Sequence, residues 1–311
     1  MKILQLNNIA GVPVYLNKAL RQLGVDSQIV VFRDNTHWGF DHNLNVDRFP
    51  RPAQPFYRFA SLLKSHLDYD IYHYHSSSFL TGYADAPLLK ALGKKLVYHH
   101  HGSDIRGKGI PLLSRFADAR YVSTPDLLDW APEAEWLPNP IYRDDYAKYI
   151  TKGGNRGVSN KALKVAHSSK GKREHRKSDA IEKTCLKLQA EGIVEWVSLE
   201  GLPRKEFLKK ISEVDVYIDN LGGGWYGMAA LEAMSMKKAV CVYVREDLEG
   251  YGDESAYANV NEGNIEETLR DLAQDEELRQ NYAKAGFGYV NKKHDAKKIA
   301  KRVLKKYREI L

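Results

Sequence analysis

Apolar segments of strand length alternate with helical segments along most of the chain, and this alternation constrains the fold more than any other feature of the sequence. The segments expected to be strands in the first half are KILQLN, SQIVVF, DIYHYH, KLVYHH and RYVST, with helices expected over 12–23, 54–67 and 79–92. Strands separated by helices of about ten or more residues predict right-handed crossovers and a parallel sheet with helices on both faces. The first half is therefore predicted to be a Rossmann-like domain.

The pattern breaks around residues 138–161, where Pro, Gly, Asn and charged residues concentrate as they do in interdomain linkers. Alternation then resumes with LKVAHS, VEWVSL, DVYIDN and AVCVYV as strands, and a length of 311 residues suits two domains of roughly 150 residues each. We predict an α/β protein of two Rossmann-like domains whose parallel sheets face each other across a cleft. The predicted parts are an N-terminal domain over 1–145, a linker over 146–160, a C-terminal domain over 161–290, and a basic helix over 291–311 that crosses back to the N-terminal domain.

Composition argues against several classes of protein. Cys185 and Cys241 are far apart in the chain and form no CxxC pair, so neither a disulfide framework nor a zinc ribbon is supported. No apolar run approaches the ~20 residues that a membrane span needs, and the apolar segment at the N-terminus is too short for a signal peptide. We expect a cytoplasmic protein.

The net charge of +7 is concentrated in the tail, where residues 292–311 hold nine basic and two acidic residues. The rest of the chain is balanced, which argues against a nucleic-acid partner. Apolar residues recur in the tail at helical spacing. A terminal helix packed on the body with a solvated basic face is expected, and contact of that face with anionic lipid headgroups at the inner side of a membrane is the alternative.

The most informative segment is GGGWYGMAALEAMSMKKAVCVYV, residues 222–244. Glycines followed by a helix that starts near Gly227 allow close backbone approach, and the free N–H groups of the helix start favour phosphate. Glu232, on the second turn, is placed to accept hydrogen bonds from sugar hydroxyls. An ordinary buried helix after a glycine-rich loop fits the spacing equally well.

The segment GMAALEAMSMKKAV resembles the signature helix of retaining GT-B glycosyltransferases of family 4. The resemblance continues in the opening strand, loop and helix, in DIYHYHS with KALGKKLVYHHHGSDIR, in WLPNPI, and in VDVYIDNL before the glycines. It implies a metal-independent transferase of the hexosyltransferase type, which moves a sugar from a nucleotide-sugar donor to the hydroxyl of a glycan or lipid-linked acceptor with retention of configuration. No cofactor is expected.

The resemblance also implies roles for individual residues of the C-terminal half. Glu232 would receive the ribose hydroxyls. The donor phosphates would contact Lys177 and the helix start at Gly227, Met228 and Ala229. They would also contact Lys172, or Arg173 if the alignment is shifted by one residue. A departing diphosphate gains charge in the transition state, so cations in the loop over 166–179 would stabilise that state most. The donor loops would contain Gly11, Gly224, Trp225 and Tyr226. Gly224 stands where the family carries its first acidic residue, so contacts to the sugar are expected to differ.

Histidines suggest two kinds of chemistry. His101, in HGSDIR at a strand end, is expected to contact the donor sugar or to polarise the reacting hydroxyl, with Asp104 orienting it. His73 and His75 share one strand face, but no spaced set of ligands accompanies them, and we expect no metal site. Asp68 and Asp70 match a DxD motif at the start of a strand, where a solvated turn is the better interpretation.

Two alternatives to a transferase remain open at this stage. A nucleotide-sugar epimerase shares the two-domain layout, although no set of carboxylates suited to elimination is evident. A non-catalytic scaffold of the same fold is the other alternative, because Gly224 replaces an acidic residue.

Overall fold

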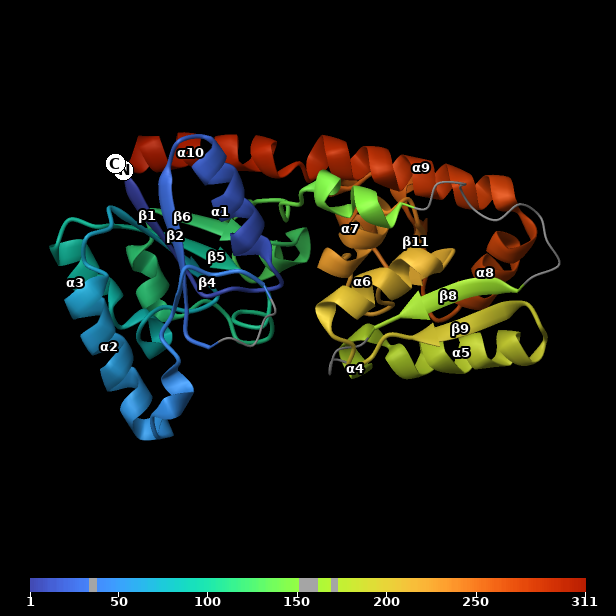
Figure 1. Ribbon diagram of the computed structural model, residues 1–311, viewed down its shortest axis with the longest axis horizontal. Helices are drawn as coiled ribbons and strands as arrows, with labels where there is room; N and C mark the ends of the chain where they lie inside the picture. The colour runs from blue at the N-terminus through green and yellow to red at the C-terminus, as the bar shows by residue number, and fades with distance from the viewer. Residues whose placement is uncertain (34–37, 151–161, 169–172) are drawn as a thin grey trace. The chain divides into compact units, whose positions relative to one another are not determined.

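The computed structural model describes residues 1–33, 38–150, 162–168 and 173–311. The chain divides into two compact units: Met1–Pro140 together with Ala296–Leu311, and Ile141–Asp295. Each unit is built on one parallel sheet with helices packed against it (Figure 1). The predicted α/β fold with two Rossmann-like domains is confirmed. Of the predicted linker, residues 151–160 lie outside the described residues.

Unit 1 orders its strands with a reversal at the centre of the sheet. The order is β3 (His42–Asn43), β2 (Asp26–Val31), β1 (Lys2–Leu6), β4 (Ile71–His75), β5 (Lys95–His100), β6 (Ala119–Val122) and β7 (Glu135–Trp136). Its helices are α1 (Val12–Gln22), α2 (Gln54–Ser65), α3 (Ala86–Ala91) and α10 (Ala296–Ile310), with 3-10 turns η1 (Val46–Arg48), η2 (Arg51–Ala53), η3 (Thr81–Tyr83), η4 (Leu112–Phe116) and η5 (Pro125–Asp129). After β1 the chain continues toward one side of the sheet, and after β4 it continues toward the other. The topological switch point, where the strand order reverses, therefore lies between β1 and β4.

The helix predicted over 79–92 is α-helical only over Ala86–Ala91. The buried carboxylate of Asp85 accepts the N–H groups of Phe79 and Leu80 and the hydroxyl of Tyr74. These bonds hold the preceding residues in a turn, because a carboxylate that satisfies backbone donors competes with helical hydrogen bonding.

The two faces of the unit 1 sheet differ in polarity. Tyr72 and Tyr74 of β4 join an apolar cluster on one face, whereas the alternate residues, His73 and His75, point to the other face. Tyr307 of α10 reaches this second face and hydrogen bonds to His73. Figure 1 shows α10 (red) next to α1, with which it packs.

Helix α10 is strongly amphipathic. Ile299, Val303, Leu304 and Tyr307 are buried, whereas the basic residues Lys297, Lys298, Lys301, Lys305 and Arg308 are exposed. Its apolar face is therefore used inside unit 1. In the part of the chain that the structure describes, no helix has the length and apolar character needed to cross a membrane.

Unit 2 has a five-stranded sheet with the order β12 (Ala258–Asn259), β11 (Ala239–Val242), β10 (Val216–Ile218), β8 (Leu163–His167) and β9 (Val194–Ser198). Its helices are α4 (Arg173–Arg176), α5 (Ser178–Ala190), α6 (Arg204–Glu213), α7 (Met228–Ser235), α8 (Ile265–Gln274) and α9 (Glu276–Lys293), with 3-10 turns η6 (Arg143–Tyr149), η7 (Glu246–Tyr251) and η8 (Glu254–Ala256). The switch point lies between β8 and β10, so the loops that follow these two strands leave the sheet side by side.

Candidate functional site

The glycine loop of unit 2 is folded by its own side chains. Asn220, two residues after the end of β10, accepts the N–H of Gly223 at 2.6 Å and donates to the carbonyl of Trp225 at 3.1 Å. A Cβ on Gly222 would lie 2.6 Å from the carbonyl oxygen of His175. Gly224 has φ +73°, and a Cβ there would lie 2.9 Å from Cδ of Arg245. These glycines are thus required by the close packing of the loop itself.

Helix α7 starts at this loop, as predicted, with Gly227 as its N-cap. The N–H of Gly227 donates to Oδ2 of Asp219 at 2.6 Å, and the Asp219 side chain is fully buried. Met228 and Ala229 form the first turn, where backbone N–H groups have no acceptor within the helix. A helix start of this kind favours an anionic ligand.

Arg176 lies at the same place, although the sequence did not single it out. Its Nη1 donates to Oδ1 of Asp219 at 3.2 Å and to the carbonyl of Ser168 at 3.0 Å. Its Nη2 lies 3.9 Å from the point where a Cβ of Gly227 would be. The guanidinium thus faces both the buried carboxylate and the start of α7.

The cations predicted from the sequence are placed differently from one another. Lys172 lies outside the described residues. Arg173 is partly exposed and forms ion pairs with Asp179, Glu182 and Glu200, which occupy its donors. Lys177 precedes α5 with φ 57°, contacts the Gly222 position through Cγ, and pairs with Glu262 at 3.2 Å. Lys177 therefore borders the glycine loop, whereas Arg173 is held by acidic partners.

Glu232, a residue of α7, is buried and pairs with the guanidinium of Arg204. Arg204 donates to both of its carboxylate oxygens, one at 2.9 Å, and Tyr146 donates to Oε1 at 3.1 Å. The Glu232 side chain is 2% exposed. The two-pronged contact with Arg204 is the strong geometry for an arginine–carboxylate pair, so Glu232 stabilises unit 2 whatever its role toward a ribose.

Trp225 and Tyr226, predicted for a donor loop, are packed inside unit 2. Their rings lie 4.6 Å apart, and both side chains are buried. The Tyr226 hydroxyl bonds to Tyr289 at 2.5 Å and to His294 at 3.0 Å. This hydroxyl is therefore engaged within the protein.

The predicted elements of unit 1 lie at the carboxyl ends of its strands. Gly11 caps α1 with φ +79°, and a Cβ there would overlap the indole of Trp38. Asp104 accepts the N–H groups of His101 and Gly102 through Oδ1, and its Oδ2 receives Nδ1 of His100 at 2.6 Å. Asp104 thus fixes the backbone at His101 and the ring of its neighbour.

The ring of His101 is held instead by His75, at 3.0 Å between His101 Nε2 and His75 Nδ1. Further into the unit, His75 Nε2 lies 2.8 Å from Oε1 of Gln5, and His73 Nδ1 lies 2.5 Å from Oη of Tyr307. His73, His75 and His99 are completely buried. Burial lowers the pKa of His73 to about 3 and that of His101 to about 4, so these imidazoles are neutral at pH 7.

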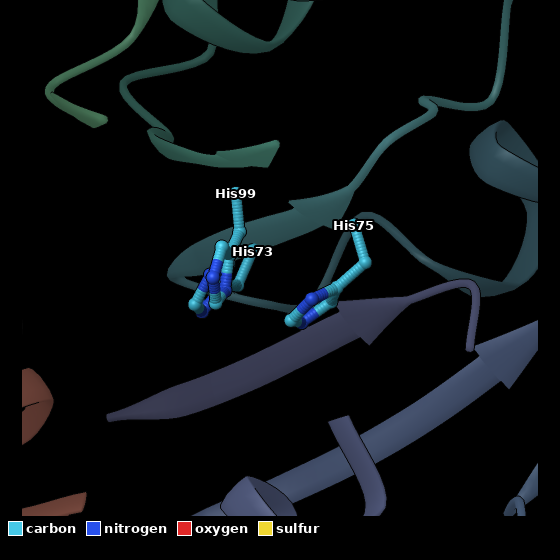
Figure 2. Close-up of side chains that lie close together, drawn as sticks. All are labelled: His73, His75 and His99. Atoms are coloured by element: carbon cyan, nitrogen blue, oxygen red, sulfur yellow. The ribbon is translucent and has the colours of Figure 1, made fainter. Parts of the chain in front are cut away.

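Three of these imidazoles form a cluster that could hold a metal ion. Figure 2 shows the rings of His73, His75 and His99 gathered where β4 and β5 run side by side. Each residue offers one nitrogen, and the three nitrogens lie within 4.8 Å of one another. Ligands at about 2.0–2.1 Å from a tetrahedral zinc stand about 3.4 Å apart, a separation that this limit allows. The sequence, which placed only His73 and His75 on one face, did not predict this cluster.

Asp68 and Asp70 lie where the sequence placed them, before β4. Asp70 Oδ2 accepts the N–H of Lys2 at 2.8 Å, and Asp68 pairs with the Lys2 side chain. Both carboxylates contact Lys2 at the amino ends of the strands, opposite the carboxyl ends near which the histidines lie.

Comparisons with known proteins show similarity of fold without similarity of sequence. No family model and no curated protein matches the chain. The structure of HepE from Anabaena with UDP and glucose has a TM-score of 0.67 at 15% identity and covers 99% of both chains. The S. aureus MnaA–UDP structure has a TM-score of 0.63 at 15% identity and covers 100% of this chain and 98% of that one. AviGT4, a glycosyltransferase involved in avilamycin A biosynthesis, has a TM-score of 0.63 at 12% identity and covers 100% and 98%. The likeness extends over the whole chain and supports the expected GT-B type of fold.

Replacing Glu232 by Ala should destabilise unit 2 by about 3–5 kcal/mol, because Arg204 would lose its buried partner. Glu266→Ala is the control, since Glu266 also pairs with Lys187 and Arg270 but on the surface. Urea unfolding followed by fluorescence measures both. Similar losses for the two variants would show that the Glu232–Arg204 pair stabilises no more than a surface pair.

Replacing His99 by Leu should make stability less sensitive to acid. Neither ring nitrogen of His99 has a hydrogen-bond partner among the described residues, and burial lowers its pKa well below 6.5. Below pH 6.5 the unfolded chain takes up a proton that the folded chain refuses, so the histidine costs about 1.4 kcal/mol per pH unit as the pH falls. Unfolding midpoints from pH 7.5 to 5 should fall less in His99→Leu than in the parent. An unchanged slope would mean that His99 takes up its proton in the folded state.

Proposed function

We propose that this protein transfers a sugar from a nucleotide-sugar donor to an acceptor hydroxyl. The observation that carries the proposal is the switch point of unit 2, where the start of α7, Lys177 and Arg176 lie around one loop. Two of the similar structures contain UDP, which makes UDP the first ligand to test. The same surroundings suit the two phosphates of a nucleoside diphosphate.

The chemistry follows from where charge develops. As the bond from the sugar to the diphosphate breaks, negative charge grows on the phosphate oxygens, and fixed cations and N–H groups lower the energy of that state most. Lys177 and the first turn of α7 would serve this purpose, and Arg176 would offset the charge of Asp219. We propose retention of configuration, with the departing phosphate oxygen assisting deprotonation of the acceptor, so that no protein nucleophile and no metal are needed.

On unit 1, His101 is proposed to contact the transferring sugar, and Glu232 of unit 2 the ribose. The acceptor would be a glycan or a lipid-linked glycan, with the chain acting as a hexosyltransferase. Incubation with UDP-glucose and other donors, read by NMR, tests the activity. Release of free sugar and UDP supports a transferase. A UDP-sugar with one inverted stereocentre indicates an epimerase. Binding of UDP without turnover indicates a scaffold.

Replacing Lys177 by Met should weaken UDP binding about 10- to 150-fold, the usual cost of one charge-assisted hydrogen bond. Met keeps the length of the side chain and removes the charge. Lys187→Met is the matched control, because Lys187 lies on α5, the helix that Lys177 precedes, and also pairs with a partly exposed carboxylate, Glu266, at 2.8 Å. Calorimetric titration with UDP measures both. Equal affinities in the two variants would remove Lys177 from the phosphate site.

We also propose that the basic face of α10 contacts anionic lipid. Its apolar face is buried, so the attraction would be electrostatic and should disappear at high salt. Sedimentation with liposomes that contain phosphatidylserine should capture the protein at low salt, and changing Lys301 and Lys305 to Gln should reduce the captured fraction severalfold. Lys209 and Lys210 of α6, changed in the same way, are the control. Capture that is independent of lipid charge would contradict the proposal.

A further inference from the structure

A continuous chain of hydrogen bonds runs through the buried face of unit 1 and ends at His101. It begins at His73, whose Nδ1 lies 2.5 Å from Oη of Tyr307, and Gln5 Nε2 lies 3.3 Å from the same oxygen. It continues from Gln5 Oε1 to His75 Nε2 at 2.8 Å, and from His75 Nδ1 to His101 Nε2 at 3.0 Å. Four of the five side chains are buried, and that of His101 is partly exposed.

The amide of Gln5 gives this chain a direction. An amide oxygen only accepts and an amide nitrogen only donates, whereas a neutral imidazole has one nitrogen of each kind. Because Oε1 of Gln5 faces His75, the Nε2 of His75 must carry the proton, and its Nδ1 is left to accept. The partner of that Nδ1 must then donate, so the proton of His101 lies on Nε2.

We propose that Gln5 and His75 are positioning residues that fix the tautomer of His101 and leave its Nδ1 as an acceptor for a ligand hydroxyl. This inference rests on the proposed function only for the identity of the ligand, a sugar. Nδ1 of His101 can accept a hydroxyl hydrogen bond without breaking any link of the chain. A carbonyl oxygen, which only accepts, is a poor partner for the same nitrogen.

The donor-to-acceptor direction of the hydrogen-bond chain also disfavours the binding of a metal ion by the histidine cluster. On the other side of Gln5, its Nε2 donates to Tyr307, the Tyr307 hydroxyl donates to His73 Nδ1, and the proton of His73 must lie on Nε2. Reversing the chain would free Nε2 of His73 but would put a proton on Nδ1 of His75. In neither direction do His73 Nε2 and His75 Nδ1 both offer a lone pair to one ion.

The tautomer can be read directly by NMR of protein labelled with 15N in its histidines, without any substrate. The signals of His101 are identified by their loss in His101→Gln. We expect the proton on Nε2, and a proton on Nδ1 would overturn the proposal. A protein that shows the expected tautomer yet releases no sugar from any donor would refute the proposed function and leave the tautomer assignment standing.

Three variants then separate positioning from packing. Gln5→Met removes the acceptor for His75 at similar size, so His101 should show a mixture of tautomers and donor turnover should fall about tenfold with UDP affinity unchanged. Tyr307→Phe removes a hydrogen bond on the other side of Gln5 and should leave the His101 tautomer unchanged. Gln5→Glu retains the acceptor and should restore the tautomer. If Tyr307→Phe disturbs His101 as much as Gln5→Met does, the chain is only a packing feature.

A zinc titration completes the test. Wild-type protein should bind zinc no more tightly than a His99→Leu variant. Tight binding that His99→Leu abolishes, together with a shift of the His73 and His75 signals, would show that the cluster is a metal site and that the hydrogen-bond chain does not hold.

Discussion

Every strand in both sheets runs parallel to its neighbours, and this constraint decides where chemistry can occur. Parallel pairing gathers the carboxyl ends of the strands at one edge of each sheet, and the switch point leaves room between two loops there. In unit 2 the loops after β8 and β10 meet, and the N–H of Leu221 donates to the carbonyl of Arg176 at 3.1 Å. The glycine loop, Arg176 and the start of α7 are neighbours because of this strand order.

The buried histidines of unit 1 lower the stability of the fold, because their polar rings are removed from water. Placing neutral imidazoles beneath helices removes them from water, and His99 has no hydrogen bond among the described residues to compensate. Two polar side chains reduce the cost for the others, Gln5 from β1 and Tyr307 from α10. Helix α10 is therefore more than a cover for apolar residues, because its tyrosine completes the polar layer under it.

Sequence reasoning predicted what depends on local pattern. The longer strands, the start of α7 at Gly227 and the amphipathic α10 follow from periodicity and glycine placement, whereas the two-residue strands β3, β7 and β12 were not predicted. It could not predict contacts between distant segments: Arg204 lies 28 residues from Glu232, and Tyr307 lies 302 residues from Gln5. In the basic loop after β8, spacing alone could not show that Arg173 is held by three carboxylates and that Arg176 turns toward Asp219. Which cation of this loop faces the glycine loop depends on tertiary partners, and the role of these cations toward a phosphate stays a prediction.

The glycine at position 224 is required by the backbone of the loop. A residue with φ +73° beside the Arg245 side chain accommodates a Cβ poorly, so placing a carboxylate there would strain the loop. The acidic side chain at the start of α7 is Asp219, which accepts the Gly227 N–H from below. Its charge would repel a phosphate, but Arg176 balances it, and the next N–H groups of the first turn remain available to an anion. Under the proposed function, a diphosphate would bind at this loop without a carboxylate at position 224, and contacts to the sugar would come from other residues of the chain.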